Sequence, residues 1–230
     1  MTDNIPVIAV DGPSGVGKGT LCQALAQHFG WHLLDSGSLY RVTALAAQKH
    51  GVPLDDEARL TLVAARLEVR FETVAEQETQ VLLEGENVTA AIRSEACGNA
   101  ASVVAALPAV RTALLQRQRD FRQPPGLVAD GRDMGTVVFP DATVKLFLTA
   151  SPATRAIRRY KQLREKGINV SLAALEKDIA ERDARDAGRA VAPLKPAADA
   201  QVVDTTELGI AAVRQQALAI LAAYLKPGTA

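Results

Sequence analysis

Short apolar runs and longer amphipathic stretches share most of the chain. Runs with the length of buried strands lie at 6–10, 31–35, 127–129, 144–149 and 201–204. Stretches with apolar residues at helical spacing lie at 21–29, 39–46, 60–67, 94–106, 110–121 and 210–224. Strands that alternate with helices predict an α/β fold, in which helices flank a parallel sheet.

The period of the pattern changes between residues 68 and 90. Leu67, Val69 and Phe71 alternate with charged residues, a second short apolar run follows, and a turn is expected at 85–87. This alternation predicts short antiparallel strands with one polar face. A small β insertion here interrupts the alternation of strands and helices, so we expect a sub-domain boundary in this region.

Residues that favour helix ends mark several boundaries. Gly30 and Gly51 are expected to end the first two helices. Candidate N-caps precede four of the expected helices, and they are Ser36 to Ser38, Asp55 or Asp56, Ser151 with Pro152 after it, and Thr205 or Thr206.

A glycine-rich segment connects the first expected strand to the first expected helix. It consists of Gly12, Pro13, Ser14, Gly15, Val16, Gly17, Lys18, Gly19 and Thr20. Glycines lack Cβ atoms, so the chain can wrap closely around an anion, with its N–H groups and the helix N-terminus directed at a phosphate. Lys18 would reach the β- and γ-phosphates. This context predicts a phosphate-binding loop for a nucleoside triphosphate; the alternative is a glycine-rich turn without a ligand.

Two residues are expected where a Mg²⁺ ion would accompany the triphosphate. Thr20 would supply a hydroxyl, one position later than usual because a glycine follows the lysine. Asp130 ends the third expected strand and would bind the ion through water. Arg132 and Asp133 follow at the same sheet edge, and the alternative for this segment is a loop with surface charges. Arg41 also lies just beyond a strand end, where it would meet a phosphate or be an exposed helix arginine.

The segment 155–189 is the basic part of the chain. It holds seven arginines and three lysines against six acidic residues, and Gly167 divides it into two helical halves. The common alternative for such a segment is a solvated face with salt bridges. Arginine is suited to bidentate phosphate contacts, and the triphosphate needs its charge neutralised. We therefore expect a helical lid.

Bulk properties restrict the remaining possibilities. The chain has 230 residues, and its 26 Lys and Arg balance its 26 Asp and Glu, so no global field favours nucleic acid or a membrane as a partner. The N-terminus has no secretory pattern, and no apolar run approaches the ~18 residues of a membrane span. Cys22 and Cys97 form no metal or redox motif. These features are typical of a cytoplasmic protein, and we expect a monomer.

Together these features favour phosphoryl transfer to a small substrate. Such a reaction depends on positioning and charge neutralisation, and closure of a lid excludes water. A regulatory GTPase would carry an Asn-Lys-x-Asp element, which the sequence lacks. The acceptor remains open from these residues alone.

At four places the chain resembles the bacterial cytidylate kinases. The motifs are the loop 12–20, Asp35-Ser36-Gly37-Ser38-Leu39-Tyr40-Arg41, Asp130-Gly131-Arg132-Asp133-Met134-Gly135-Thr136, and Glu181-Arg182-Asp183-Ala184-Arg185 with the segment up to Leu194. The resemblance implies transfer of the ATP γ-phosphate to CMP or dCMP. It also implies a core domain at 1–35, 106–154 and 190–230, a monophosphate-binding domain at 36–105, and a lid at 155–189.

The resemblance also implies roles for single residues. Ser102, Arg111 and Asp133 would read the cytosine, and Arg182 and Asp186 would hold the ribose hydroxyls. Arg41, Arg132 and Arg189 would bind the acceptor phosphate, with Ser36 beside them, and Arg158 would meet the ATP phosphates. The catalytic set would be Lys18, Arg132, Arg158 and Arg189. Val42 and Thr43 depart from the alanine-rich helix of the family without touching the motif. A kinase for UMP or AMP is the closest alternative.

Overall fold

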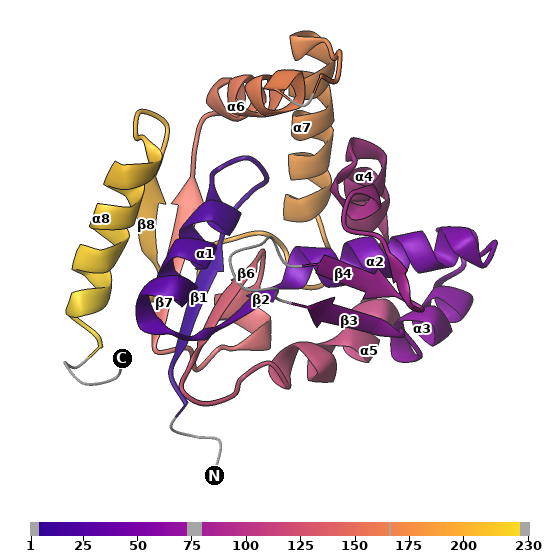
Figure 1. Ribbon diagram of the computed structural model, residues 1–230, viewed down its shortest axis with the longest axis horizontal. Coiled ribbons are helices and arrows are strands. Elements are labelled where there is room, and N and C mark those ends of the chain that lie inside the picture. The colour runs from indigo at the N-terminus through magenta and orange to yellow at the C-terminus, as the bar shows by residue number, and fades with distance from the viewer. Residues whose placement is uncertain (1–4, 73–79, 166, 226–230) are drawn as a thin grey trace. The chain divides into compact units, whose positions relative to one another are not determined.

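The computed structural model describes residues 5–72, 80–165 and 167–225. A parallel sheet of five strands forms the centre of the first of two compact units, residues 1–35 and 118–230 (Figure 1). The strand order is β2 (His32–Asp35), β6 (Leu127–Gly131), β1 (Val7–Asp11), β7 (Val144–Thr149) and β8 (Gln201–Asp204). All five correspond to expected strands, and the predicted parallel α/β sheet is confirmed.

Burial explains why the central strand is a continuous apolar run. Every residue of β1 is buried, which is the usual situation of a parallel strand with helices on both faces. Helix α1 (Lys18–Phe29) contributes Leu21 and Leu25 to the same core, and α8 (Ile210–Ala222) contributes Val213 and Leu221. This packing fixes the start of α1, and with it the glycine-rich loop, at the carboxyl end of β1.

Two further helices of this unit cover the segment expected to form a lid. Helix α6 (Pro152–Glu165) and helix α7 (Leu172–Ala187) make a helical hairpin. Gly167 lies between them with φ of 73°, and Ser171 caps α7 by accepting a hydrogen bond from the Ala174 amide. The predicted pair of helical halves is confirmed, and Lys166 lies outside the described residues.

Residues 36–117 form the second compact unit. It contains α2 (Ser36–Lys49), α3 (Glu57–Ala65), the antiparallel strands β3 (Val69–Glu72), β4 (Gln80–Leu83) and β5 (Glu86–Asn87), the short η1 (Ala91–Arg93), α4 (Glu95–Val104) and most of α5 (Pro108–Arg119). The expected β insertion is therefore present, and its residues 73–79 lie outside the described ones. The unit extends beyond the expected boundary at 105 because Val110 and Leu114 of α5 are fully buried in its core.

Several local predictions are confirmed. Asp56 caps α3 by accepting from the Arg59 amide at 3.0 Å, and Ser151 caps α6 by accepting from the Thr154 amide at 3.2 Å. Gly30 ends α1 in a left-handed conformation, with φ of 65°. In each case the determining contact is local, so a short stretch of sequence is sufficient to predict it.

Three local predictions are wrong. None of Ser36 to Ser38 precedes α2 as an N-cap, because the helix begins at Ser36, directly after β2. The β4–β5 turn is formed by Glu84 and Gly85, with φ of 51° and 83°, instead of 85–87. Neither Thr205 nor Thr206 caps α8, which begins after Gly209.

The two threonine hydroxyls have other partners. The hydroxyl of Thr205 donates to the Val16 carbonyl at 3.2 Å, and that of Thr206 donates to the Asp204 carboxylate at 2.6 Å. Helix α8 therefore begins three residues later than Thr206 as its N-cap would place it.

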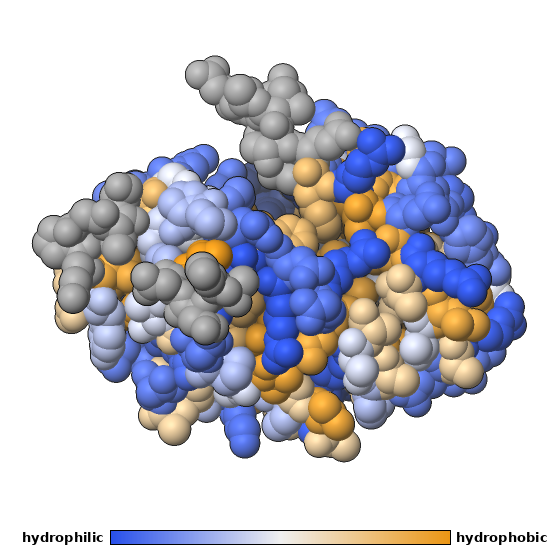
Figure 2. All heavy atoms as spheres, turned by 90° about the horizontal axis from the view of Figure 1, so that it is seen from below, coloured by the Kyte–Doolittle hydropathy of each residue, from blue (hydrophilic) through white to orange (hydrophobic). Residues whose placement is uncertain are grey.

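Within the described ranges, no single helix is long and apolar enough to cross a membrane. Only α4 and α5 taken together, with a bend of 103° between them, meet the length and composition requirement. The face shown in Figure 2 carries hydrophilic and hydrophobic residues interspersed.

Candidate active site

At three positions of the glycine-rich loop, the backbone has a conformation that only glycine adopts easily. Gly12, Gly15 and Gly17 have φ of 146°, 79° and 94°. A Cβ on Gly12 would lie 2.2 Å from the Leu148 carbonyl oxygen, which is too close for any side chain at this position. Gly19 is different, since it lies inside α1 with ordinary helical geometry. The loop is therefore tightly curved, and its shape depends on backbone angles that glycine permits.

Lys18 begins α1, and its side chain turns back over the loop. Its ammonium group donates a hydrogen bond to the Pro13 carbonyl at 2.8 Å, and the residue is only 6% exposed. Burial and the nearby Arg132 guanidinium lower the pKa of Lys18 to about 8, although the Asp130 carboxylate acts in the opposite direction. The amine is thus held close to the wrapped backbone, where an anionic ligand would favour its charged form.

Two carboxylates lie at the carboxyl ends of neighbouring strands. Asp35 of β2 and Asp130 of β6 are paired in the parallel register. Burial raises the pKa of Asp130 to about 6, Lys18 lowers it, and Asp35 raises it further. An Asp130 oxygen lies 3.7 Å from the position that a Cβ on Gly19 would take, so this carboxylate faces the first turn of α1. The sequence analysis gave Asp35 only as the first residue of a family motif and assigned it no role.

This first turn also carries Thr20, so a hydroxyl and a carboxylate belong to the same end of the sheet. Hard oxygen ligands of this kind fit Mg²⁺, which keeps several waters and takes only one or two protein ligands beside substrate phosphates. Across the described parts of the chain, no group of three or more His, Cys, Asp or Glu side chains is arranged to hold a metal by itself. The donor set therefore fits a metal that arrives with a nucleotide.

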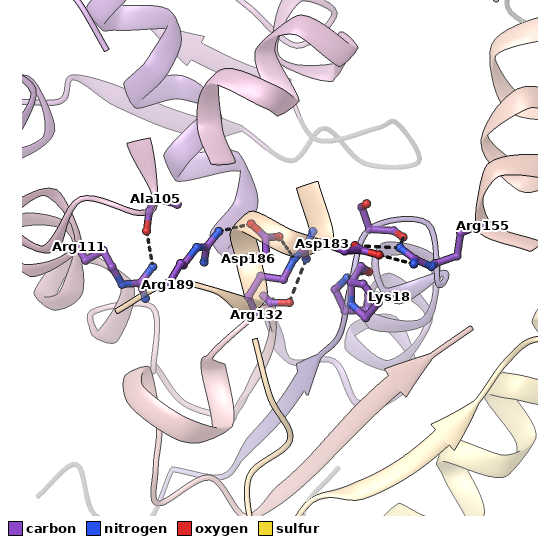
Figure 3. Close-up of polar contacts among 11 residues, drawn as sticks. Lys18, Ala105, Arg111, Arg132, Arg155, Asp183, Asp186 and Arg189 are labelled. Carbon is purple, nitrogen blue, oxygen red and sulfur yellow. Dashed lines mark hydrogen bonds and ion pairs between the residues drawn. The ribbon is translucent and has the colours of Figure 1, made fainter. Parts of the chain in front are cut away.

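Three charged residues of the predicted acceptor site form one cluster (Figure 3). Asp186 of α7 is 2% exposed and accepts hydrogen bonds from the guanidinium groups of Arg132 and Arg189. The Arg132 contact measures 3.1 Å, and Arg132 also donates to the Gly131 carbonyl. One buried carboxylate thus fixes two arginines that the sequence analysis assigned to the acceptor phosphate.

Arg155 is a residue that the sequence analysis named only as part of the basic segment. It is 2% exposed, and its guanidinium group donates to the carbonyl oxygens of Ser14 and Ala150 at 3.2 Å each. It also forms a bidentate pair with Asp183 of α7 (Figure 3). Arg155 therefore connects the α6–α7 hairpin to the glycine-rich loop, and its spacing gave no signal that separated it from the other arginines.

Arg158 lies one helical turn farther along α6 and has different partners. Its guanidinium group donates to both oxygens of Thr205 and to the Leu208 carbonyl. The charge of Arg182, on α7, lowers the pKa of Lys18. Of the two α6 arginines, Arg155 thus contacts the loop and Arg158 contacts the segment after β8.

Of the remaining predicted site residues, Asp133 lies in the first unit and is 2% exposed, and the others lie in the second unit. Ser36 and Ser102 are buried. Arg111 is buried too; it donates to the Ala105 carbonyl at 3.2 Å and lies over the Tyr40 ring, 5.6 Å from its centre. Tyr40 was not singled out by the sequence analysis.

Arg41 of the second unit also has backbone partners. It donates to the carbonyl oxygens of Ile92 and Ser94, the latter at 3.3 Å. Both arginines of this unit that were assigned to CMP are thus held in place by carbonyl oxygens.

Comparison with known proteins gives a consistent result. The family model described as "Cytidylate kinase" matches residues 8–223. A cytidylate kinase from Shewanella frigidimarina is 61% identical and covers 95% of this chain and 96% of its own length, and one from Aeromonas hydrophila is 62% identical and covers 91% of each. Among solved structures, a gluconokinase from Sinorhizobium meliloti 1021 aligns over 95% of this chain and 92% of its own, with 17% identity and a TM-score of 0.49.

Proposed function

This chain belongs to the cytidylate kinase family, and from that membership we infer that it phosphorylates CMP and dCMP with ATP as the donor. The products are CDP or dCDP and ADP. The observation that carries the conclusion is the family match over residues 8–223, which includes the complete phosphate loop and the clustered arginines.

We propose that the loop 12–20 binds the ATP phosphates. The positive φ angles of its glycines are consistent with N–H groups that point inward, and the N-terminus of α1 adds partial positive charge. Lys18 is already placed over the loop, and the arriving phosphates favour its protonated form. Thr20 and, through water, Asp130 would hold the Mg²⁺ ion, which when bound neutralises charge on the β- and γ-phosphates.

The acceptor phosphate is the proposed ligand of Arg41, Arg132 and Arg189. A phosphate monoester carries nearly two negative charges at neutral pH, and guanidinium groups bind its oxygens in bidentate fashion. Asp186 holds Arg132 and Arg189 at fixed positions, so less side-chain entropy would be lost when they bind a phosphate. Because the acceptor oxygen is already anionic, the transfer needs no single essential general base.

The cytosine is the proposed ligand of Ser102, Arg111 and Asp133. Its exocyclic amine would donate to the Asp133 carboxylate, and its carbonyl and ring nitrogen would accept from Arg111 and Ser102. UMP presents a carbonyl in place of that amine and would leave the carboxylate without a donor. Arg182 and Asp186 would hold the ribose hydroxyls, and Ser36 would lie beside the acceptor phosphate.

The 155–189 segment is the proposed lid of the monomeric enzyme. Its arginines would add positive charge around the transferring group, and closure would exclude water that competes with the acceptor. Arg155 already contacts the loop through the Ser14 carbonyl. We propose that Arg158 acts on the ATP phosphates only after its present partners, Thr205 and Leu208, are exchanged.

The test is an ADP-release assay with ATP, Mg²⁺ and each of CMP, dCMP, UMP, AMP and GMP. Turnover with CMP and dCMP that exceeds turnover with UMP by about 10²-fold or more is expected from the unpaired carboxylate. The variant Asp133→Ala should lose most of this preference while its KM for ATP stays close to wild type. Equal use of CMP and UMP by the wild type would contradict the assignment of the base site.

A further inference from the structure

Asp11 is a buried carboxylate to which neither the motifs nor the proposed mechanism assign a role. It is the last residue of β1, immediately before Gly12, and is 4% exposed. Its two oxygens accept hydrogen bonds from the backbone amides of Met134 and Gly135, each at 2.8 Å. These amides are more than 120 positions away in the sequence.

The residues that Asp11 holds form a short helical turn, η2 (Met134–Val138), with π-type hydrogen bonds. The Asp133 carbonyl accepts from the Val137 and Val138 amides at 2.9 and 3.2 Å. Asp133 is therefore the residue from which the turn begins, and the direction of its side chain depends on how the turn is oriented. Asp11 fixes the first two amides of this turn.

The other end and the sides of the turn are also fixed. Arg119 donates to the carbonyl oxygens of Val137 and Val138. A Cβ on Gly131 would lie 2.8 Å from the Met134 side chain, and one on Gly135 would lie 3.1 Å from that of Lys145. Glycine at these two positions permits close packing of the turn against its neighbours.

The burial of Asp11 is unfavourable unless its charge has partners. Burial raises its pKa to about 7, although the amides of Gly135 and Met134 lower it. The other charged groups that act on it are the Asp133 carboxylate, which raises the pKa, and the Lys18 ammonium group, which lowers it. An apolar side chain would avoid this cost, but it would leave two buried N–H groups without acceptors.

We propose that Asp11 is a positioning residue that sets the orientation of Asp133 relative to the phosphate loop. It connects the backbone immediately before Gly12 to the turn that carries Asp133, and both lie in the same compact unit. The inference rests on the proposed role of Asp133 in reading the cytosine. A shift of the turn would change which base is accepted more than how tightly ATP is bound.

The test is the variant Asp11→Asn, which keeps the shape but turns an amide NH₂ toward one of the two N–H groups. The CMP-over-UMP ratio of kcat/KM should fall about 10-fold or more, as for other residues that orient a binding group, and KM for ATP should change less than about 3-fold. The matched control is Asp141→Asn, an exposed aspartate bound to Arg122, which should keep the wild-type ratio. A folded Asp11→Asn enzyme with an unchanged ratio would overturn the proposal.

A second variant covers the case in which Asp11→Asn does not fold. Arg119→Gln changes an exposed side chain, removes its hydrogen bonds to the opposite end of the turn, and should lower the same ratio about 3-fold. If Asp11→Asn is unfolded, an unchanged ratio in Arg119→Gln overturns the proposal.

Asp133→Ala, measured in parallel, separates the two hypotheses. If it keeps the CMP preference, the cytosine assignment fails and the role of Asp11 fails with it. If it loses the preference while Asp11→Asn retains it, only the role of Asp11 fails. Because Asp11 acts through Asp133, the double variant should show no further loss of preference beyond Asp133→Ala.

Discussion

The glycine-rich loop and the α6–α7 hairpin both carry basic side chains, but the positions of these side chains are fixed in different ways. The loop is shaped by backbone angles at Gly12, Gly15 and Gly17. In the hairpin, Arg155 and Arg158 lie on one helix, three positions apart, and yet Arg155 donates to the loop while Arg158 donates to the segment after β8. The shape of a loop that is set by backbone angles can be predicted from the residues of the loop itself. The position of a long side chain depends instead on hydrogen-bond acceptors that are distant in the sequence.

The largest effect should follow from Lys18→Ala, which removes the ammonium group that lies over the loop backbone. Charge on the transferring phosphates would lose a partner in a water-excluded site, so kcat/KM should fall by about 10³-fold or more, a cost of several kcal/mol in transition-state stabilisation. Steady-state kinetics with CMP would measure it. Lys177→Ala, which removes an exposed lysine in a long i,i+4 pair, is the control. Full activity in Lys18→Ala would contradict the proposed role of Lys18 in the loop.

A pair of glycine variants tests whether backbone shape defines the loop. Gly12→Ala places a Cβ 2.2 Å from the Leu148 carbonyl oxygen at a positive φ, and should lower the free energy of unfolding by about 3 kcal/mol or more. Gly19→Ala lies in α1 with its nearest neighbour at 3.7 Å, and should stay within about 1 kcal/mol of wild type. Urea unfolding of the two variants would decide, and equal losses would contradict the backbone argument.

A pair of arginine variants examines the lid in the same way. Arg155→Met removes a buried partner of Asp183 and of two carbonyl oxygens, and should cost about 2–3 kcal/mol in unfolding free energy, reduced because Asp183 is partly exposed. Arg158→Met should cost about 1 kcal/mol, since its partners are oxygens without full charge. Lys161→Met, on the exposed side of α6, should change little. A larger loss for Arg158→Met would reverse the ranking of the two arginines.

The smallest expected effect concerns pH. The pKa of Asp11 is raised in the folded protein from its usual 3.8 to about 7, so between these values the folded state binds the proton more strongly. The stabilising contribution is present at pH 4 and is lost as the pH rises through about 7. The wild type should therefore exceed Asp11→Asn in unfolding free energy by about 1–2 kcal/mol more at pH 6 than at pH 8. A difference that does not vary with pH would show that the folded pKa of Asp11 is not raised.

Local patterns predicted the elements and the loop because their causes are local. The run at 6–10 became β1, Asp56 caps α3, and the glycines stand where positive φ is needed. Asp11 could not be predicted, since an aspartate before a glycine resembles any turn residue and its partners are in η2. Thr205 was expected as a cap, but its hydroxyl reaches Val16, 189 positions away. The partners of Asp11 and Thr205 are tertiary contacts, which cannot be predicted from a short stretch of sequence.

The order of the strands has a consequence for the synthesis of the chain. β6 pairs with both β1 and β2, which do not pair with each other. β6 is also made after the whole of the second unit. At the usual rate of translation, roughly 5–20 s separate the appearance of β2 from that of β6, because about 90 residues intervene. During this time β1 and β2 lack the strand that pairs with both of them. Their unpaired backbone groups could pair with another chain, so this interval is when the nascent chain most needs protection from aggregation.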